Sequence, residues 1–126
     1  MNENSNKSYL IFVLPEEFDE NKMEYSDAIT WAHTNSSNKN VLKLTLDDIY
    51  LLDERVLDII NKENNSMIGP YEDNWVFSQE VKQSIIEKLK IYYVSANIKR
   101  EINLICEIIR LLEFGLKIDH NIYFLF

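Results

Sequence analysis

The chain has 126 residues, of which 46% are hydrophobic and 27% charged, and its net charge is −8. This length suits one domain with a substantial core, and this composition excludes a wholly disordered chain. The only two glycines, Gly69 and Gly115, lie too far apart for a glycine-rich phosphate loop, which excludes the common ATP- and NAD-binding sites.

The negative charge is concentrated in the first part of the chain. Residues 1–73 carry 15 acidic and 6 basic side chains, a net charge of −9, whereas residues 74–126 carry 6 acidic and 7 basic ones, a net charge of +1. Such a field repels the phosphates of nucleic acids and membranes and attracts basic proteins. We therefore expect a protein partner, with no nucleic-acid binding and no membrane binding.

The N-terminal third predicts a strand, a helix and a loop. Residues 7–14 predict a strand covered on both faces, because six consecutive apolar residues precede Pro15. The proline predicts the first turn of a helix. The broken apolar periodicity of this helix leaves one rod or two pieces open, with a restart near Ser26. Residues 34–40 are polar and predict a loop.

The middle of the chain predicts a second strand and a second helix. Residues 41–46 alternate partly between apolar and polar and predict a strand of about four residues. Thr45 followed by Asp48 indicates a helix start, and the apolar face then continues to about Asn61. Residues 64–74 are rich in turn formers and predict a crossing loop, after which Trp75 to Phe77 form a short strand or an aromatic lid.

The longest helical signals follow. Ser78 is a suitable N-cap for a helix, and residues 98–112 repeat apolar side chains at steps of three and four. Whether residues 78–114 form one helix or two stays open, because Ala96-Asn97 indicates a bend without requiring a break. Gly115 predicts a left-handed helix stop.

Residues 122–126 are all apolar and predict a final strand. Such a strand exposed to water would promote association, so pairing with the apolar N-terminal run is expected. The predicted fold class is α+β: a predominantly helical single domain over residues 1–126, with a small, mostly antiparallel sheet that includes the N- and C-terminal strands. Residues 1–7 are expected to be flexible.

The candidate partner-binding residues are carboxylates on two acidic helices and the mixed aromatic and acidic residues of the crossing loop. Carboxylates would steer a basic partner, and aromatic side chains would anchor it. The alternatives are solvated outer helix faces and a loop folded back over the core. The candidates are Glu16, Glu17, Asp19, Glu20, Glu24, Asp27, Asp47, Asp48, Asp53, Glu54, Asp58, Tyr71, Glu72, Asp73 and Trp75.

Chemical sites are sparse in this sequence. Cys106 is the only cysteine and lies in an apolar helical stretch, so we expect it to be buried. His33 and His120 lack metal-ligand spacing, and no nucleophile motif is present. We therefore expect no metal, no cofactor and no enzymatic activity. The single cysteine and the absence of a long apolar segment favour a cytoplasmic location.

A small, acidic, glycine-poor chain without catalytic motifs resembles the bacterial immunity proteins of contact-dependent growth inhibition systems. The resemblance is one of general character over the whole chain. It implies a non-enzymatic inhibitor that binds a cognate, basic, nuclease-type toxin domain. The alternatives are a scaffold or assembly subunit with an exposed strand or helix face, and a small carboxylate-dependent hydrolase. The partner's identity, the binding face and the oligomeric state stay open.

Overall fold

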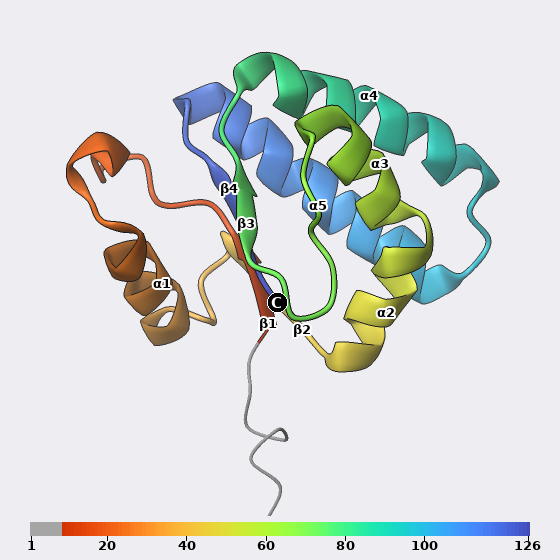
Figure 1. Ribbon diagram of the computed structural model, residues 1–126, viewed down its shortest axis with the longest axis horizontal. Helices are drawn as coiled ribbons and strands as arrows, with labels where there is room; N and C mark the ends of the chain where they lie inside the picture. The colour runs from red at the N-terminus through yellow and green to blue at the C-terminus, as the bar shows by residue number, and fades with distance from the viewer. Residues whose placement is uncertain (1–8) are drawn as a thin grey trace, which may run out of the picture.

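A four-stranded antiparallel sheet with helices on both faces organises the protein in a computed structural model that describes residues 9–126 (Figure 1). The expected flexibility of residues 1–7 lies outside the described residues. The elements in chain order are β1 (Tyr9–Phe12), the 3-10 helix η2 (Glu20–Lys22), α1 (Tyr25–Thr34), β2 (Val41–Leu44), α2 (Leu46–Glu54), α3 (Val56–Asn64), β3 (Asn74–Val76), α4 (Gln79–Ser95), α5 (Lys99–Ile118) and β4 (Ile122–Leu125). The predicted α+β class is confirmed.

The two terminal strands lie side by side at the centre of the sheet. The strand order is β2-β1-β4-β3, and β1 pairs antiparallel with β4, with Leu10 opposite Leu125 and Phe12 opposite Tyr123. Every residue of both strands is buried, as expected for apolar runs covered on two faces. Because β4 has a neighbouring strand on each side, it has no free edge to offer a partner.

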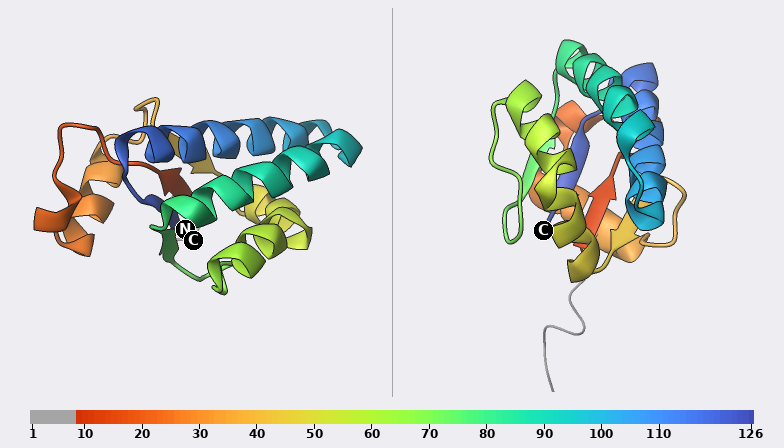
Figure 2. Two further views of the ribbon diagram at one scale, coloured as in Figure 1. Left: turned by 90° about the horizontal axis from the view of Figure 1, so that it is seen from above. Right: turned by 90° about the vertical axis from the view of Figure 1, so that its right-hand side faces the viewer.

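Alternate side chains of the central strands enter two separate cores. Ile11 and Phe124 pack with α2, α3, α4 and α5, whereas Phe12 and Tyr123 pack on the opposite face beneath α1. The long helices α4 and α5 lie side by side over the first face, and α1 stands apart on the second (Figure 2). The second core is smaller and is closed by partly buried side chains from residues 15–34.

The helix predicted to start at Pro15 is wrong, and the two-piece alternative is nearer to the structure. The Phe18 N–H donates to the Pro15 carbonyl at 3.1 Å and closes a turn instead. Asp19 then caps η2 by accepting from the Asn21 N–H at 3.1 Å. Because short polar side chains compete for backbone hydrogen bonds in this way, the segment does not form a continuous helix.

The helix predicted to run from Asp48 to about Asn61 is broken in two at Arg55. This residue has φ −135° and ψ −46°, outside the helical region. Its guanidinium carbon lies 5.2 Å from the centre of the Tyr92 ring on α4. Beyond the break, α3 buries Val56, Leu57 and Ile60 and packs against α4.

The bend at Ala96-Asn97 is confirmed, but Gly115 is not the stop of the last helix. α5 continues to Ile118, and Asp119 takes the left-handed position with φ 56°. A side chain at Gly115 would place its Cβ 2.9 Å from the carbonyl oxygen of His120. The glycine is therefore required by close packing of the chain after α5, not by its own φ angle.

Burial on α5 differs from the expectation at Cys106, which is exposed, not buried. On the same helix Glu101 is buried and accepts a hydrogen bond of 2.9 Å from the Tyr92 hydroxyl. The partner on α4 explains why this charged side chain is tolerated away from water.

Asp48 joins the start of α2 to the start of α5. Its carboxylate accepts from Arg100 Nε at 2.9 Å and Nη2 at 2.8 Å, and from the Thr45 N–H at 3.0 Å. The hydrogen bonds from Arg100 are the main reason that the pKa of Asp48 is lowered. A two-pronged contact of this kind, on a nearly buried carboxylate, is a stronger interaction than an ordinary surface ion pair.

Glu20 joins η2 to the beginning of β4. Its carboxylate accepts from the Asn121 N–H at 2.9 Å and from the Tyr123 hydroxyl at 2.8 Å. The pKa of Tyr123 is raised mainly by burial and secondly by its hydrogen bond to Glu20. Residues 15–24 are thus held against the sheet by a charge-assisted contact in addition to the small core beneath α1.

Replacement Asp48→Asn is expected to lower the free energy of unfolding by about 2 kcal/mol at pH 7, because the two-pronged charged pair with Arg100 is lost. Since the native pKa is lowered, the stabilisation is complete above the ordinary aspartate pKa of about 3.9 and is lost as the pH falls below it. Urea unfolding at several pH values should show that the difference in the free energy of unfolding between the variant and wild type becomes smaller in acid. Asp47→Asn, at an exposed neighbour, is the control, and a pH-independent difference would contradict the assignment.

Replacement Glu20→Gln is expected to lower the free energy of unfolding by about 1–2 kcal/mol, because the hydrogen bonds to Asn121 and Tyr123 lose their charged acceptor. Amide hydrogen exchange of Asn121 should become faster than in wild type. Glu17→Gln, an exposed carboxylate of the same segment, is the matched control. Unchanged exchange at Asn121 would argue against the contact.

Candidate functional site

The loop of residues 65–73 connects α3 to β3 and is fixed to α3 by asparagine side chains. Asn61 donates from Nδ2 to the Ile68 carbonyl at 2.8 Å and accepts the Ile68 N–H on Oδ1 at 2.7 Å. Asn64 donates to the Trp75 carbonyl at 3.1 Å. The loop runs beside α2 before β3 begins (Figure 1). Its position is therefore set by specific contacts.

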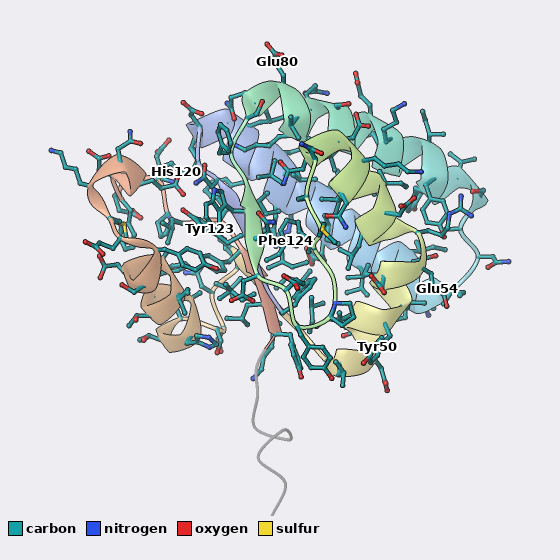
Figure 3. The ribbon with its side chains drawn as sticks, viewed as in Figure 1. Tyr50, Glu54, Glu80, His120, Tyr123 and Phe124 are labelled. Atoms are coloured by element: carbon teal, nitrogen blue, oxygen red, sulfur yellow. The ribbon has the colours of Figure 1, made fainter. Side chains whose placement is uncertain are left out.

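One side of this loop contacts α2. A hydrogen bond between the hydroxyl groups of Tyr50 and Tyr71 is the main reason that the pKa of Tyr50 is raised. A Cβ at Gly69 would lie 3.4 Å from Asp53 Oδ1, so the loop backbone lies close to this carboxylate. Tyr50 and Glu54 both lie on α2 (Figure 3). The predicted residues of α2 and the predicted residue Tyr71 are thus neighbours.

β3, which follows the loop, contacts the start of α1. The rings of Tyr25 and Trp75 are 5.3 Å apart, and Tyr25 also lies 6.2 Å from Tyr123 on β4. Burial and the nearby Asp73 raise the pKa of Tyr25. Two groups of predicted residues that are about fifty positions apart in the sequence, 16–27 and 71–75, are therefore brought together.

We call residues 15–27 and 65–77 together the acidic loop face. These two segments carry eight acidic side chains and one basic side chain, Lys22, a net charge of −7. The whole chain carries −8. The fold therefore places a negative charge almost equal to that of the entire molecule on two adjoining segments, where it produces a concentrated field.

A hollow of about 670 Å³ lies between residues 16–21, β3 and the end of α5. His120 lies near it, on the same side of the sheet as Tyr123 (Figure 3). Its lining combines carboxylates with two exposed aromatic rings and differs from the apolar pockets that bind most small ligands. The carboxylates and rings are those of Glu16, Glu17, Asp19, Glu20, Asp119, Trp75 and Phe77.

Several predicted carboxylates accept hydrogen bonds from other groups of the protein. Glu20 and Asp48 form the internal contacts described above. Asp73 accepts the Phe126 N–H at 2.9 Å, and Asp27 accepts the Glu24 N–H at 3.1 Å at the start of α1. These side chains have structural roles that the charge pattern of the sequence did not indicate.

The other predicted carboxylates are exposed and fall into two groups. One group lies on the acidic loop face and the other on α2 and α3. Two of them form surface ion pairs: Asp19 Oδ2 lies 3.9 Å from Lys22 Nζ, and Asp58 Oδ2 lies 3.1 Å from Lys62 Nζ. The first group comprises Glu16, Glu17, Asp19, Glu24 and Glu72, and the second comprises Asp47, Asp53, Glu54 and Asp58.

The sequence did not indicate Lys82, which is fully buried beside this region. Its ammonium donates to Gln79 Oε1 at 2.7 Å, and the carboxylates of Asp119 and Glu20 act on it electrostatically. Burial lowers the pKa of Lys82, and these two carboxylates oppose that effect. A lysine four residues into an amphipathic helix carries no sequence signal for burial, because its neighbours come from other elements. Phe77, which the sequence placed in a short strand or an aromatic lid, is exposed at the hollow.

Residues 9–126 contain no cluster of three or more histidine, cysteine, aspartate or glutamate side chains suited to a metal ion. Within the same residues, no helix combines the length and the apolar character needed to cross a bilayer.

The sequence and the fold both match known DNA mimics. The model of the DMP12 family, described as DNA-mimic protein, matches residues 7–126. The DNA mimic protein DMP12 of Neisseria meningitidis serogroup B is 29% identical over 105 residues, which are 82% of this chain and 85% of that protein. The solved structure of a Neisseria DNA mimic protein DMP12 has a TM-score of 0.77 and 24% identity, and covers 95% of this chain and 100% of that one.

These matches correct the function predicted from the sequence. The resemblance to toxin-neutralising immunity proteins was wrong, because the family model covers nearly the whole chain and describes another class of acidic protein. The scaffold and hydrolase alternatives do not fit this family either, and the interior position of β4 removes the exposed strand on which the scaffold depended. The chain belongs to the DNA-mimic protein family.

Proposed function

We propose that this protein binds a DNA-binding protein through the surface with which that protein contacts DNA. Membership of the DNA-mimic family is the observation that carries the proposal. The acidic loop face supplies the matching chemistry, since residues 15–27 and 65–77 hold a net charge of −7. The partner is then a basic protein, and the action is binding without catalysis.

The physical basis is competition for the same basic side chains. Proteins hold duplex DNA largely through lysine and arginine contacts to phosphates. Exposed carboxylates such as Glu16, Glu17 and Glu72 present negative charge from fixed positions on the folded chain. A partner occupied in this way has fewer basic groups available for DNA, so its DNA occupancy falls as the concentration of the mimic rises.

Electrostatic attraction also speeds the encounter of the two proteins. This contribution weakens as salt is added, because exposed charges are screened over about 8–10 Å at physiological ionic strength. Since proteins that bind bacterial DNA act in the cytoplasm, the proposal includes a cytoplasmic site of action.

The displacement of proteins from DNA tests this function. Proteins of a bacterial extract that are retained on immobilised duplex DNA are challenged with the purified protein at low salt. We expect one or a few DNA-binding proteins to be released and to co-migrate with it as a stoichiometric complex in size-exclusion chromatography. Added duplex DNA should dissociate that complex. If nothing is released, or if polyglutamate of equal charge releases the same proteins equally well, the proposal is wrong.

Matched variants locate the effect on the acidic loop face. Triple replacement of Glu16, Glu17 and Glu72 by glutamine should weaken the complex by about 3-fold to 100-fold at low salt, because three exposed charge pairs of about 0.2–1 kcal/mol each contribute about 0.6–3 kcal/mol together. The control replaces Glu80, Glu87 and Glu113, exposed on α4 and α5, by glutamine and changes the net charge equally. Equal loss in both triple variants would show that only net charge matters.

A further inference from the structure

We propose that the hollow beside β3 receives an arginine side chain of the DNA-binding partner, with Trp75 and Phe77 against the guanidinium plane and Glu16 and Glu17 as its counter-charges. The inference rests on the proposed function and adds the position and chemistry of one contact. It starts from the two exposed aromatic rings, which the net charge of the surface does not explain.

The rings are presented together by the geometry of the edge strand. Successive side chains of an extended chain point to opposite faces, so Trp75 and Phe77 lie on one side while Val76 enters the core. Trp75 is 42% exposed and Phe77 is 67% exposed, and both line the hollow. Large aromatic groups left partly in water beside a concave site are typical anchors of protein interfaces.

The tryptophan ring is held in place before any partner arrives. Tyr25 packs on it at 5.3 Å, and Tyr25 is supported in turn by Tyr123, whose ring stacks on Phe12 at 4.8 Å. This row of rings leads from the small core to the hollow. A ring already fixed by its neighbours loses little conformational freedom when a ligand binds to it.

Two carboxylates of the hollow are free to pair with a cation. Glu16 and Glu17 are exposed and form no hydrogen bond or ion pair with other described residues. Glu20 is engaged by β4, and the buried ammonium of Lys82 lies within electrostatic range of Glu20 and Asp119. The uncompensated negative charge therefore lies at the outer wall of the hollow, within reach of an incoming side chain.

An arginine fits this combination better than a lysine does. Its planar guanidinium stacks on aromatic faces and pairs with carboxylates through two parallel hydrogen bonds, whereas an ammonium is a compact, strongly hydrated point charge. In DNA, arginine side chains insert into narrow grooves between two walls of negative charge. A hollow bordered by Glu16 and Glu17 offers a DNA-binding protein a similar receptacle.

A hexaarginine peptide with blocked ends tests the contact without any DNA-binding protein. The protein has two tryptophans, and the indole N–H signal of Trp75 can be assigned by its absence in Trp75→Phe. During titration at low salt we expect this signal to shift to saturation while that of the less exposed Trp31 stays in place. Calorimetry should show hexaarginine binding about threefold or more tighter than hexalysine.

Variants distinguish binding of arginine in this hollow from general attraction of a cationic peptide to the acidic protein. Trp75→Ala, Phe77→Ala and the double replacement of Glu16 and Glu17 by glutamine should each weaken hexaarginine binding about two- to fivefold. Tyr93→Ala removes a ring of 41% exposure on α4 and is the matched aromatic control. Replacement of both Glu80 and Glu87 by glutamine is the matched charge control. Both controls should bind as wild type does.

Any one of four outcomes would overturn the proposal that the hollow binds arginine. These are no hexaarginine binding, a Trp75 signal that does not shift, equal affinity for the two peptides, and an equal loss of affinity in the variants and the controls. These outcomes leave the proposed function intact if the protein still displaces DNA-binding proteins from DNA. Conversely, specific hexaarginine binding without such displacement would retain the receptacle and reject DNA mimicry as its purpose. The two assays share no component other than this protein, so their failures are distinguishable.

Discussion

The antiparallel pairing of β1 with β4 is the constraint on which the rest of the structure depends. Both strands are buried on both faces and are hydrogen-bonded to neighbours on both sides. Their alternating side chains create two cores, a large one covered by four helices and a small one covered by α1. Since the pair joins the two ends of the described chain, the chain between them must leave the sheet and return to it.

The acidic surface is assembled around the end of β4. Asn121 and Tyr123 bind Glu20 and hold residues 15–24, while β3 pairs with β4 and carries Trp75. The Tyr25 ring bridges the two, between Tyr123 and Trp75. Two acidic segments that are distant in sequence thus become neighbours because both are attached to the same strand, β4.

The carboxylates of this protein divide into those that hold the fold and those that face solvent. Asp48, Glu20 and Asp73 accept hydrogen bonds from other elements, and Asp48 is in addition paired with the charged Arg100. Glu16 and Glu17 have no such partners among the described residues. A surface that imitates DNA requires carboxylates of the second kind at its points of contact, because only a carboxylate without an internal partner is available to pair with a basic side chain. Counting acidic residues cannot separate the two kinds.

Local chemistry in the sequence determined the element types and the α+β class. The apolar runs, the cap at Thr45 and Asp48 and the bend at Ala96-Asn97 act over a few residues, so they can be read from order alone. The acidic, motif-poor character was also visible, but it is shared by unrelated proteins that bind basic partners, which is why it led to the wrong family. Only the tertiary structure decided that Gly115 remains helical, that Lys82 is buried, and that Trp75 and Glu16 border one hollow. Each of these depends on groups brought together from distant parts of the chain, whose proximity no local pattern encodes.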